Sequence, residues 1–166
     1  MYFENIDNIP LFDSFLKEYK GEVDEIVNEN GNNNTKIVIF GYPSKSIYAH
    51  AVISKDDFFK SLQRKPDPFI GYNEGNCKSV NLTIQEEYAM IAHEIGHVYD
   101  TNTYIEEDFL KKEIYADSMA CKIGLRDFLV SGLEKIINSH CCGNMENQIQ
   151  ERIKCLNSEF NNLYQQ

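Results

Sequence analysis

The chain has 166 residues, of which 42% are hydrophobic and 12% aromatic, so we expect one domain, residues 1–166, with its own buried core. Its 16 basic and 26 acidic residues leave a net charge of −10 without a basic patch, which argues against nucleic acid or a membrane as partner. The sequence has no run of about 20 apolar residues, no apolar leader after Met1 and five irregularly spaced cysteines, so we expect a cytoplasmic protein.

The first part of the chain predicts one helix followed by short strands. Apolar residues recur at helical spacing from Leu11 to Asn30, which predicts a helix with one face against a core. Thr35–Phe40 and Ser46–Ser54 are rich in β-branched and aromatic residues and flank a turn with Gly and Pro, so we expect an antiparallel hairpin. The next segments predict a short helix at Lys55–Gln63 and a short strand at Phe69–Tyr72.

The middle of the chain predicts an edge strand that leads into a capped helix. Asn76–Leu82 has few apolar residues for a central strand, which favours an edge with one side open to solvent or a ligand. Thr83 and Glu86 have the spacing of a capping box, in which each side chain binds the other residue's backbone N–H. The helix that they begin should run to about Asp100. Further helices are expected at Ile105–Gly124, Leu125–Ser139 and Met145–Leu163.

Two histidines on this capped helix have the spacing of metal ligands. His93 and His97 are four residues apart, so on a helix both imidazoles project from one face and can meet a single ion. Glu94 lies about 100° around the helix from His93, at the rim of that face. A carboxylate in this position stands beside the metal without binding it, as a general base for a metal-bound water must.

The following helix supplies a third ligand and a supporting carboxylate. Glu113 and Asp117 are also four residues apart, so both lie on one helix face. Glu113 can bind the metal, while Asp117 can accept the other ring N–H of a ligating histidine and so set its tautomer. Gly96 on the first helix and Ala116 on the second are small, which permits the two helices to approach closely.

These two motifs resemble those of a known family of zinc peptidases. The segment H-E-I-G-H at residues 93–97, followed by E-I-Y-A-D at residues 113–117, is similar to the paired motifs of the gluzincin metallopeptidases. The resemblance is to soluble minimal gluzincins, to the catalytic core of the heat-shock and prenyl-protein membrane proteases, and to phage immunity-repressor proteases of ImmA type. It implies an α+β, zincin-like fold, in which a small, mostly antiparallel sheet packs on the active-site helix and the ligand-bearing helix, with further helices at both ends.

The resemblance also implies roles for the residues of both motifs. It assigns His93, His97 and Glu113 as ligands of Zn²⁺ and Glu94 as the general base. Asp117 would orient a histidine. The expected activity is that of a soluble zinc-dependent peptidase, a narrow-specificity endopeptidase that uses a zinc-activated water to cut protein or peptide substrates.

Two parts of the expected site are less closely defined by the sequence. An extended substrate would pair with the predicted edge strand, at Val80, Asn81 and Leu82. The oxyanion donor has several candidates around the third ligand, namely Tyr104, Tyr115, Arg126 and His140. His140 is preferred, although a surface histidine at a helix end is the alternative interpretation. The competing function is a zinc-containing regulatory or protein-binding module, of phage or mobile-element type, that performs no turnover.

Overall fold

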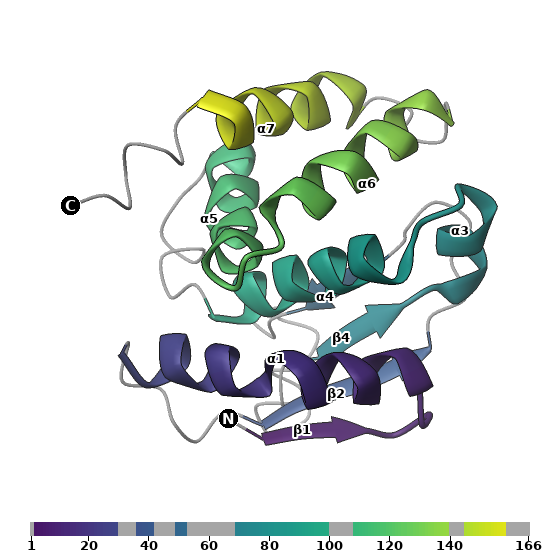
Figure 1. Cartoon of the computed structure of the whole chain (residues 1–166), viewed down its shortest axis with the longest axis vertical. Coiled ribbons are helices and arrows are strands. Elements are labelled where there is room, and N and C mark those ends of the chain that lie inside the picture. Colours follow the sequence, from purple (N-terminus) through teal and green to yellow (C-terminus); the bar gives the residue numbers. More distant parts are fainter. Residues whose placement is uncertain are drawn as a thin grey trace, which may run out of the picture.

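The computed structural model describes residues 2–29, 36–41, 49–52, 69–99, 108–139 and 145–158, and it has an α+β architecture (Figure 1). The strands are β1 (Tyr2–Asn5), β2 (Lys36–Gly41), β3 (Ala49–Val52) and β4 (Phe69–Tyr72). The helices are α1 (Pro10–Glu29), α3 (Glu74–Ser79), α4 (Ile84–Tyr99), α5 (Phe109–Lys122), α6 (Arg126–Asn138) and α7 (Glu146–Ser158). None of these described helices is long and apolar enough to cross a membrane.

The sheet is mostly parallel, so the prediction of a mostly antiparallel sheet is wrong. Its strand order is β1-β2-β4-β3, with β2 parallel to both β1 and β4, while β3 runs antiparallel to β4. The expected hairpin between β2 and β3 does not form, because β4 lies between them. This position sets Ile70 of β4 beside Ile39 of β2, and both side chains are fully buried. These isoleucines come from segments that are far apart in the sequence. The turn that suggested a hairpin therefore gave no sign that they are buried together.

Helix α4 occupies the centre of the molecule. Figure 1 shows it between the sheet on one side and α5, α6 and α7 on the other. The helix predicted from the apolar spacing of Leu11 to Asn30 is confirmed as α1, and Phe12, Phe15 and Val23 are buried in the common core. The ring of Phe15 meets that of Tyr88 edge to face, with centroids 5.6 Å apart, and so joins α1 to α4.

The predicted edge strand at Asn76–Leu82 is also wrong, because most of it belongs to helix α3. The Asn73 side chain caps this helix by accepting a hydrogen bond from the Asn76 backbone N–H at 3.1 Å. At its other end, Asn81 has a positive φ of 56°, and the backbone N–H of Leu82 donates to the Cys77 carbonyl at 3.2 Å. Val80, Asn81 and Leu82 therefore form the turn between α3 and α4.

The capping box at the start of α4 is confirmed. The Thr83 N–H donates to Glu86 Oε2 at 2.6 Å, and the Glu86 N–H donates to Thr83 Oγ1 at 3.3 Å. Helix α5 begins one residue after Asp108, whose carboxylate accepts from the Leu110 N–H at 3.0 Å. Helices α6 and α7 lie within their predicted ranges, whereas the helix expected at Lys55–Gln63 lies outside the described residues.

Candidate metal centre

Helices α4 and α5 touch backbone to backbone at the point where their small residues meet. A Cβ atom added to Gly96 would lie 2.5 Å from the Ala116 carbonyl oxygen and 2.8 Å from the Ala116 Cα. Any side chain at position 96 would therefore push the helices apart. This close approach, which the small residues predicted, carries the ligand candidates of both helices to one place.

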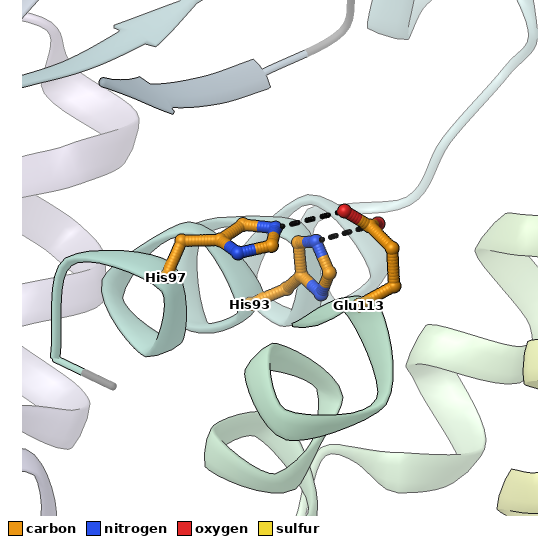
Figure 2. A group of neighbouring side chains, drawn as sticks. All are labelled: His93, His97 and Glu113. Atoms are coloured by element: carbon orange, nitrogen blue, oxygen red, sulfur yellow. Dashed lines mark ion pairs between the residues drawn. The ribbon is translucent and has the colours of Figure 1, made fainter. Parts of the chain in front are cut away.

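Three side chains from these two helices converge with their ligand atoms facing one another. His93 Nε2 lies 3.5 Å from Glu113 Oε2, and His97 Nε2 lies 3.2 Å from Glu113 Oε1 (Figure 2). One potential ligand atom from each residue lies within 4.8 Å of the other two. A buried set of two imidazole nitrogens and a carboxylate oxygen can hold a metal ion, and it matches the two-histidine, one-glutamate set of catalytic zinc sites.

Asp117 fixes the orientation of His93. Its Oδ1 lies 2.6 Å from His93 Nδ1, and only 1% of the Asp117 surface is exposed. We assign the proton to Nδ1, from which it is donated to this carboxylate. Nε2 is then the nitrogen that faces Glu113, and its lone pair becomes available when the imidazole loses its second proton.

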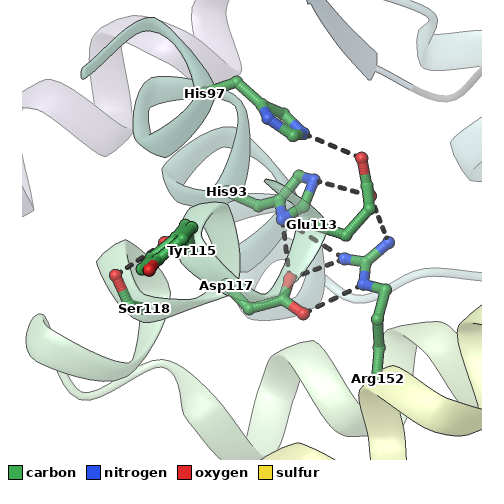
Figure 3. A network of polar contacts seen from close by, with 7 residues as sticks. All are labelled: His93, His97, Glu113, Tyr115, Asp117, Ser118 and Arg152. Carbon is green, nitrogen blue, oxygen red and sulfur yellow. Dashed lines mark hydrogen bonds and ion pairs between the residues drawn. The ribbon is translucent and has the colours of Figure 1, made fainter. Parts of the chain in front are cut away.

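Arg152 is a member of the site that the sequence analysis missed. It reaches the cluster from α7, where its Nε and Nη2 donate to Asp117 Oδ2 and Oδ1 at 2.9 and 2.6 Å. Its Nη1 donates to Glu113 Oε2 at 2.8 Å (Figure 3). The signal for it is its position in the apolar stripe of α7, three residues after Ile149 and four before Leu156, where a buried aliphatic residue is the usual choice.

The charges of the cluster hold one another in their ionised forms. Burial alone would lower the pKa of His93, but the carboxylates of Asp117 and Glu113 outweigh burial and the Arg152 charge, and raise it to about 9. Burial would raise the pKa of Glu113, yet both histidines and Arg152 hold it far below the usual range of a carboxyl group. The pKa of Asp117 is likewise lowered, against its own burial, by Arg152 and His93. In the absence of a metal the cluster therefore carries a proton that an ion must displace.

Glu94 differs from these residues in its contacts, since it acts on Arg152 through charge without a hydrogen bond. It is 7% exposed, next to His93 on α4. Across the part of the chain that the structure describes, no hydrogen bond or ion pair holds its carboxylate. A carboxylate in this position beside a candidate metal cluster can accept a proton from a bound molecule.

The other residues predicted from the sequence lie away from the cluster or outside the described chain. Tyr115 is 45% exposed, and Figure 3 shows it away from the two imidazoles and the Glu113 carboxylate. Arg126 pairs with Asp127 at 3.0 Å. Tyr104 and His140 are outside the described residues, and Val80, Asn81 and Leu82 lie in the turn before α4.

Comparison of the chain with protein-family models, with curated proteins and with solved structures found no match.

Proposed function

We propose that the protein is a zinc-dependent metallopeptidase of gluzincin type with a zincin-like fold. The observation that carries this proposal is the convergence of His93, His97 and Glu113 on one point, with Glu94 beside His93 on the same helix. Structural metal sites are usually closed by four protein ligands, whereas catalytic zinc sites use three and keep a position open. Three candidate ligands among the described residues, beside the proposed base Glu94, fit the catalytic class.

Each residue of the cluster has a separate task in peptide hydrolysis. His93, His97 and Glu113 would hold the zinc ion, which when bound supplies a Lewis acid that lowers the pKa of a water molecule and polarises a carbonyl. Glu94 accepts a proton from the attacking water on its carboxylate and returns it to the leaving amine. Asp117 keeps the Nδ1 proton on His93, so that the Nε2 lone pair stays directed into the cluster.

Strand β3 replaces the turn at residues 80–82 as the candidate substrate-binding edge. Among the described strands β3 stands at one end of the sheet, pairs with β4 alone, and lies against α4. An extended peptide can add to such an edge through backbone hydrogen bonds, with alternate side chains pointing toward the helix. The substrate class is therefore a peptide segment in extended conformation.

The first experiment combines metal analysis with a substitution at the proposed base. We expect the purified protein to contain about one zinc per chain and to cut a mixture of peptides. Glu94→Gln keeps the shape of the side chain but cannot take a proton, so it should retain the metal and lose activity by a factor of about 10²–10⁴. His97→Ala, in contrast, should lose both metal and activity. A Glu94→Gln protein that cut peptides at the wild-type rate would remove Glu94 from the mechanism.

A regulatory or binding module without turnover is the second candidate. The observation that favours it is that Arg152 and the protonated His93 together offset the charges of Glu113 and Asp117, because a metal-free cluster of this kind remains a stable part of the fold. Zinc-loaded protein that cuts no peptide in the mixture, while Glu94→Gln changes neither metal content nor partner binding, would support this candidate instead.

A further inference from the structure

A buried tyrosine and a buried glutamate join the sheet to helix α4. The hydroxyl of Tyr72, the last residue of β4, donates a hydrogen bond to Glu87 Oε2. Tyr72 is 4% exposed and Glu87 is 9% exposed, so this contact lies inside the protein. Glu87 is nearer the start of α4 than His93, and neither residue of the pair belongs to the candidate metal cluster.

Strand β4, which carries Tyr72, connects α4 to the rest of the sheet. It pairs with β2 on one side and with β3 on the other, and both β4 and β3 pack against α4. Tyr72 also lines a cavity of about 530 Å³ at the ends of β2 and β4, so a movement of its ring would bring water toward Glu87. Loosening the Tyr72–Glu87 contact therefore acts on the strand that holds β3 in the sheet.

Among the described residues, the titratable group that faces Glu87 is Tyr72. The titratable side chains nearest to this region from the other helices packed on α4 have their own partners there: Lys135 of α6 binds Glu86, Tyr19 of α1 packs on Tyr88, and Glu113 and Asp117 of α5 face His93. Strand β3 contributes His50, whose register partner is Gly71. Burial raises the pKa of Glu87 to about 7.

The two protonation states of Glu87 differ in how well they tolerate burial. A neutral carboxyl group can stay against the Tyr72 hydroxyl, whereas an ionised one keeps a single donor and loses its water. In an opened state the group is hydrated and has its ordinary pKa, about 4.3. The closed contact is therefore most stable below about pH 4.3 and loses this stability as the pH rises through about 7.

We propose that the Tyr72–Glu87 pair is a pH-dependent lock between the sheet and α4, closed when Glu87 is protonated and loosened when Glu87 is ionised. The lock acts on β4 and, through it, on β3. It requires neither a bound metal nor peptidase activity, so it holds equally for a binding module. Its failure and the failure of the proposed function are therefore separate results.

The experiment measures amide hydrogen exchange of the full chain at about pH 5 and about pH 8, corrected for the intrinsic effect of pH on exchange. It compares the wild-type protein with Glu87→Gln, which has the same shape and stays neutral at both pH values. We expect the opening of β4 and β3 in the wild-type protein, relative to the variant, to increase about 10–100-fold from the lower to the higher pH. Amides of α6 should show no such increase.

Two control variants separate the lock from general effects of charge and of ring substitution. Glu74→Gln removes a carboxylate beside the same cavity, but that side chain is 65% exposed and pairs with Lys78, so the pH effect should remain. Tyr72→Phe removes the donor and should increase the opening of β4 and β3 about 5-fold even at the lower pH. Tyr88→Phe keeps the ring that packs on α1 and should not.

Three results would overturn the lock. Equal protection of β4 and β3 at both pH values in the wild-type protein does so by itself, even if no variant folds. A pH effect that persists in Glu87→Gln, shown to be folded by far-ultraviolet circular dichroism, belongs to a different group. An equal loss of protection in α6 means that the whole chain unfolds, which contradicts a contact that acts on the sheet.

Discussion

Helix α4 carries two buried charge networks, and they differ in whether their polar atoms converge on one point. Near its start, the Glu86 carboxylate accepts hydrogen bonds from the Thr83 N–H, from Ser131 Oγ at 2.6 Å and from Lys135 Nζ at 2.7 Å. Toward its end, the His93 network is joined to α5 and α7 through Asp117 and Arg152. Both networks join α4 to the C-terminal helices, and both place carboxylates in the protein interior.

The two networks differ in how their polar atoms are arranged. Each oxygen of Glu86 already faces a donor, so that network is complete and serves as a cap and a helix-to-helix connection. In the other network, one potential ligand atom each from His93, His97 and Glu113 lies within 4.8 Å of the other two, an arrangement that could hold a shared cation. Burial and charge alone therefore do not identify a site, whereas the convergence of ligand atoms does.

The largest expected effect comes from breaking the network at Asp117. Asp117→Asn removes the negative charge and one of the two acceptor oxygens that face the buried Arg152, so we expect the free energy of unfolding to fall by about 3–5 kcal/mol. Urea denaturation of the metal-free protein measures this. The double variant Asp117→Leu with Arg152→Met should recover most of the stability, but not the metal affinity. If it also bound metal as tightly as the wild-type protein, Asp117 would have no part in orienting His93.

A smaller effect is expected at Gly96, where α4 and α5 touch beside the His93 network. Gly96→Ala places a methyl group 2.5 Å from the Ala116 carbonyl oxygen, so α5 must move and carry Glu113 away from the histidines. We expect a loss of about 1–3 kcal/mol in unfolding free energy, with weaker metal binding. Gly21→Ala in α1 is the control, because no atom lies within 4 Å of the added Cβ, and it should stabilise the protein by about 0.5–1 kcal/mol. Equal effects from both substitutions would contradict the close helix contact.

The smallest expected effect is at the Glu86 network. Lys135→Met removes a hydrogen bond to Glu86 from a lysine whose side chain is 35% exposed, so solvent already screens the pair, and we expect a loss of about 1 kcal/mol at pH 7. Metal affinity should not change.

The same substitution also has a defined pH dependence. Burial would raise the pKa of Glu86, but Lys135, Ser131 and Thr83 together lower it. A lowered carboxyl pKa contributes stability above the pKa of the unfolded chain, about 4.3, and loses it as the pH falls through the folded value. The difference between Lys135→Met and wild type should therefore shrink below about pH 4 in thermal unfolding. A difference that grew in acid would contradict the ionised state of Glu86.

The features that could be predicted from the sequence are those set by local spacing. The capping box at Thr83 and Glu86, the two histidines one turn apart, and the small residues at Gly96 and Ala116 depend on helix geometry, which a few neighbouring residues determine. The candidate metal ligands could be brought together in a prediction for this reason. Their meeting required only that two consecutive helices pack face to face.

The features that were missed depend on distant parts of the chain or on caps. Strand β4 takes the place beside β2 because Ile70 and Ile39 are buried together, and no local pattern reports that choice. Helix α3 has little apolar periodicity, and its ends are set by Asn73 and Asn81. Arg152 looks like one charged residue among several on α7, and its role follows only from the packing of that helix against α5.

The position of Arg152 in the chain gives the site an order of assembly during synthesis. Arg152 follows Glu113 by 39 residues and His93 by 59, so a ribosome delivers the histidines and both carboxylates before their compensating cation exists. Until α7 has emerged, the growing chain presents two carboxylates and two imidazoles with no arginine to hold them. The cluster is therefore more negative at this stage than in the finished protein, and Arg152 completes it last.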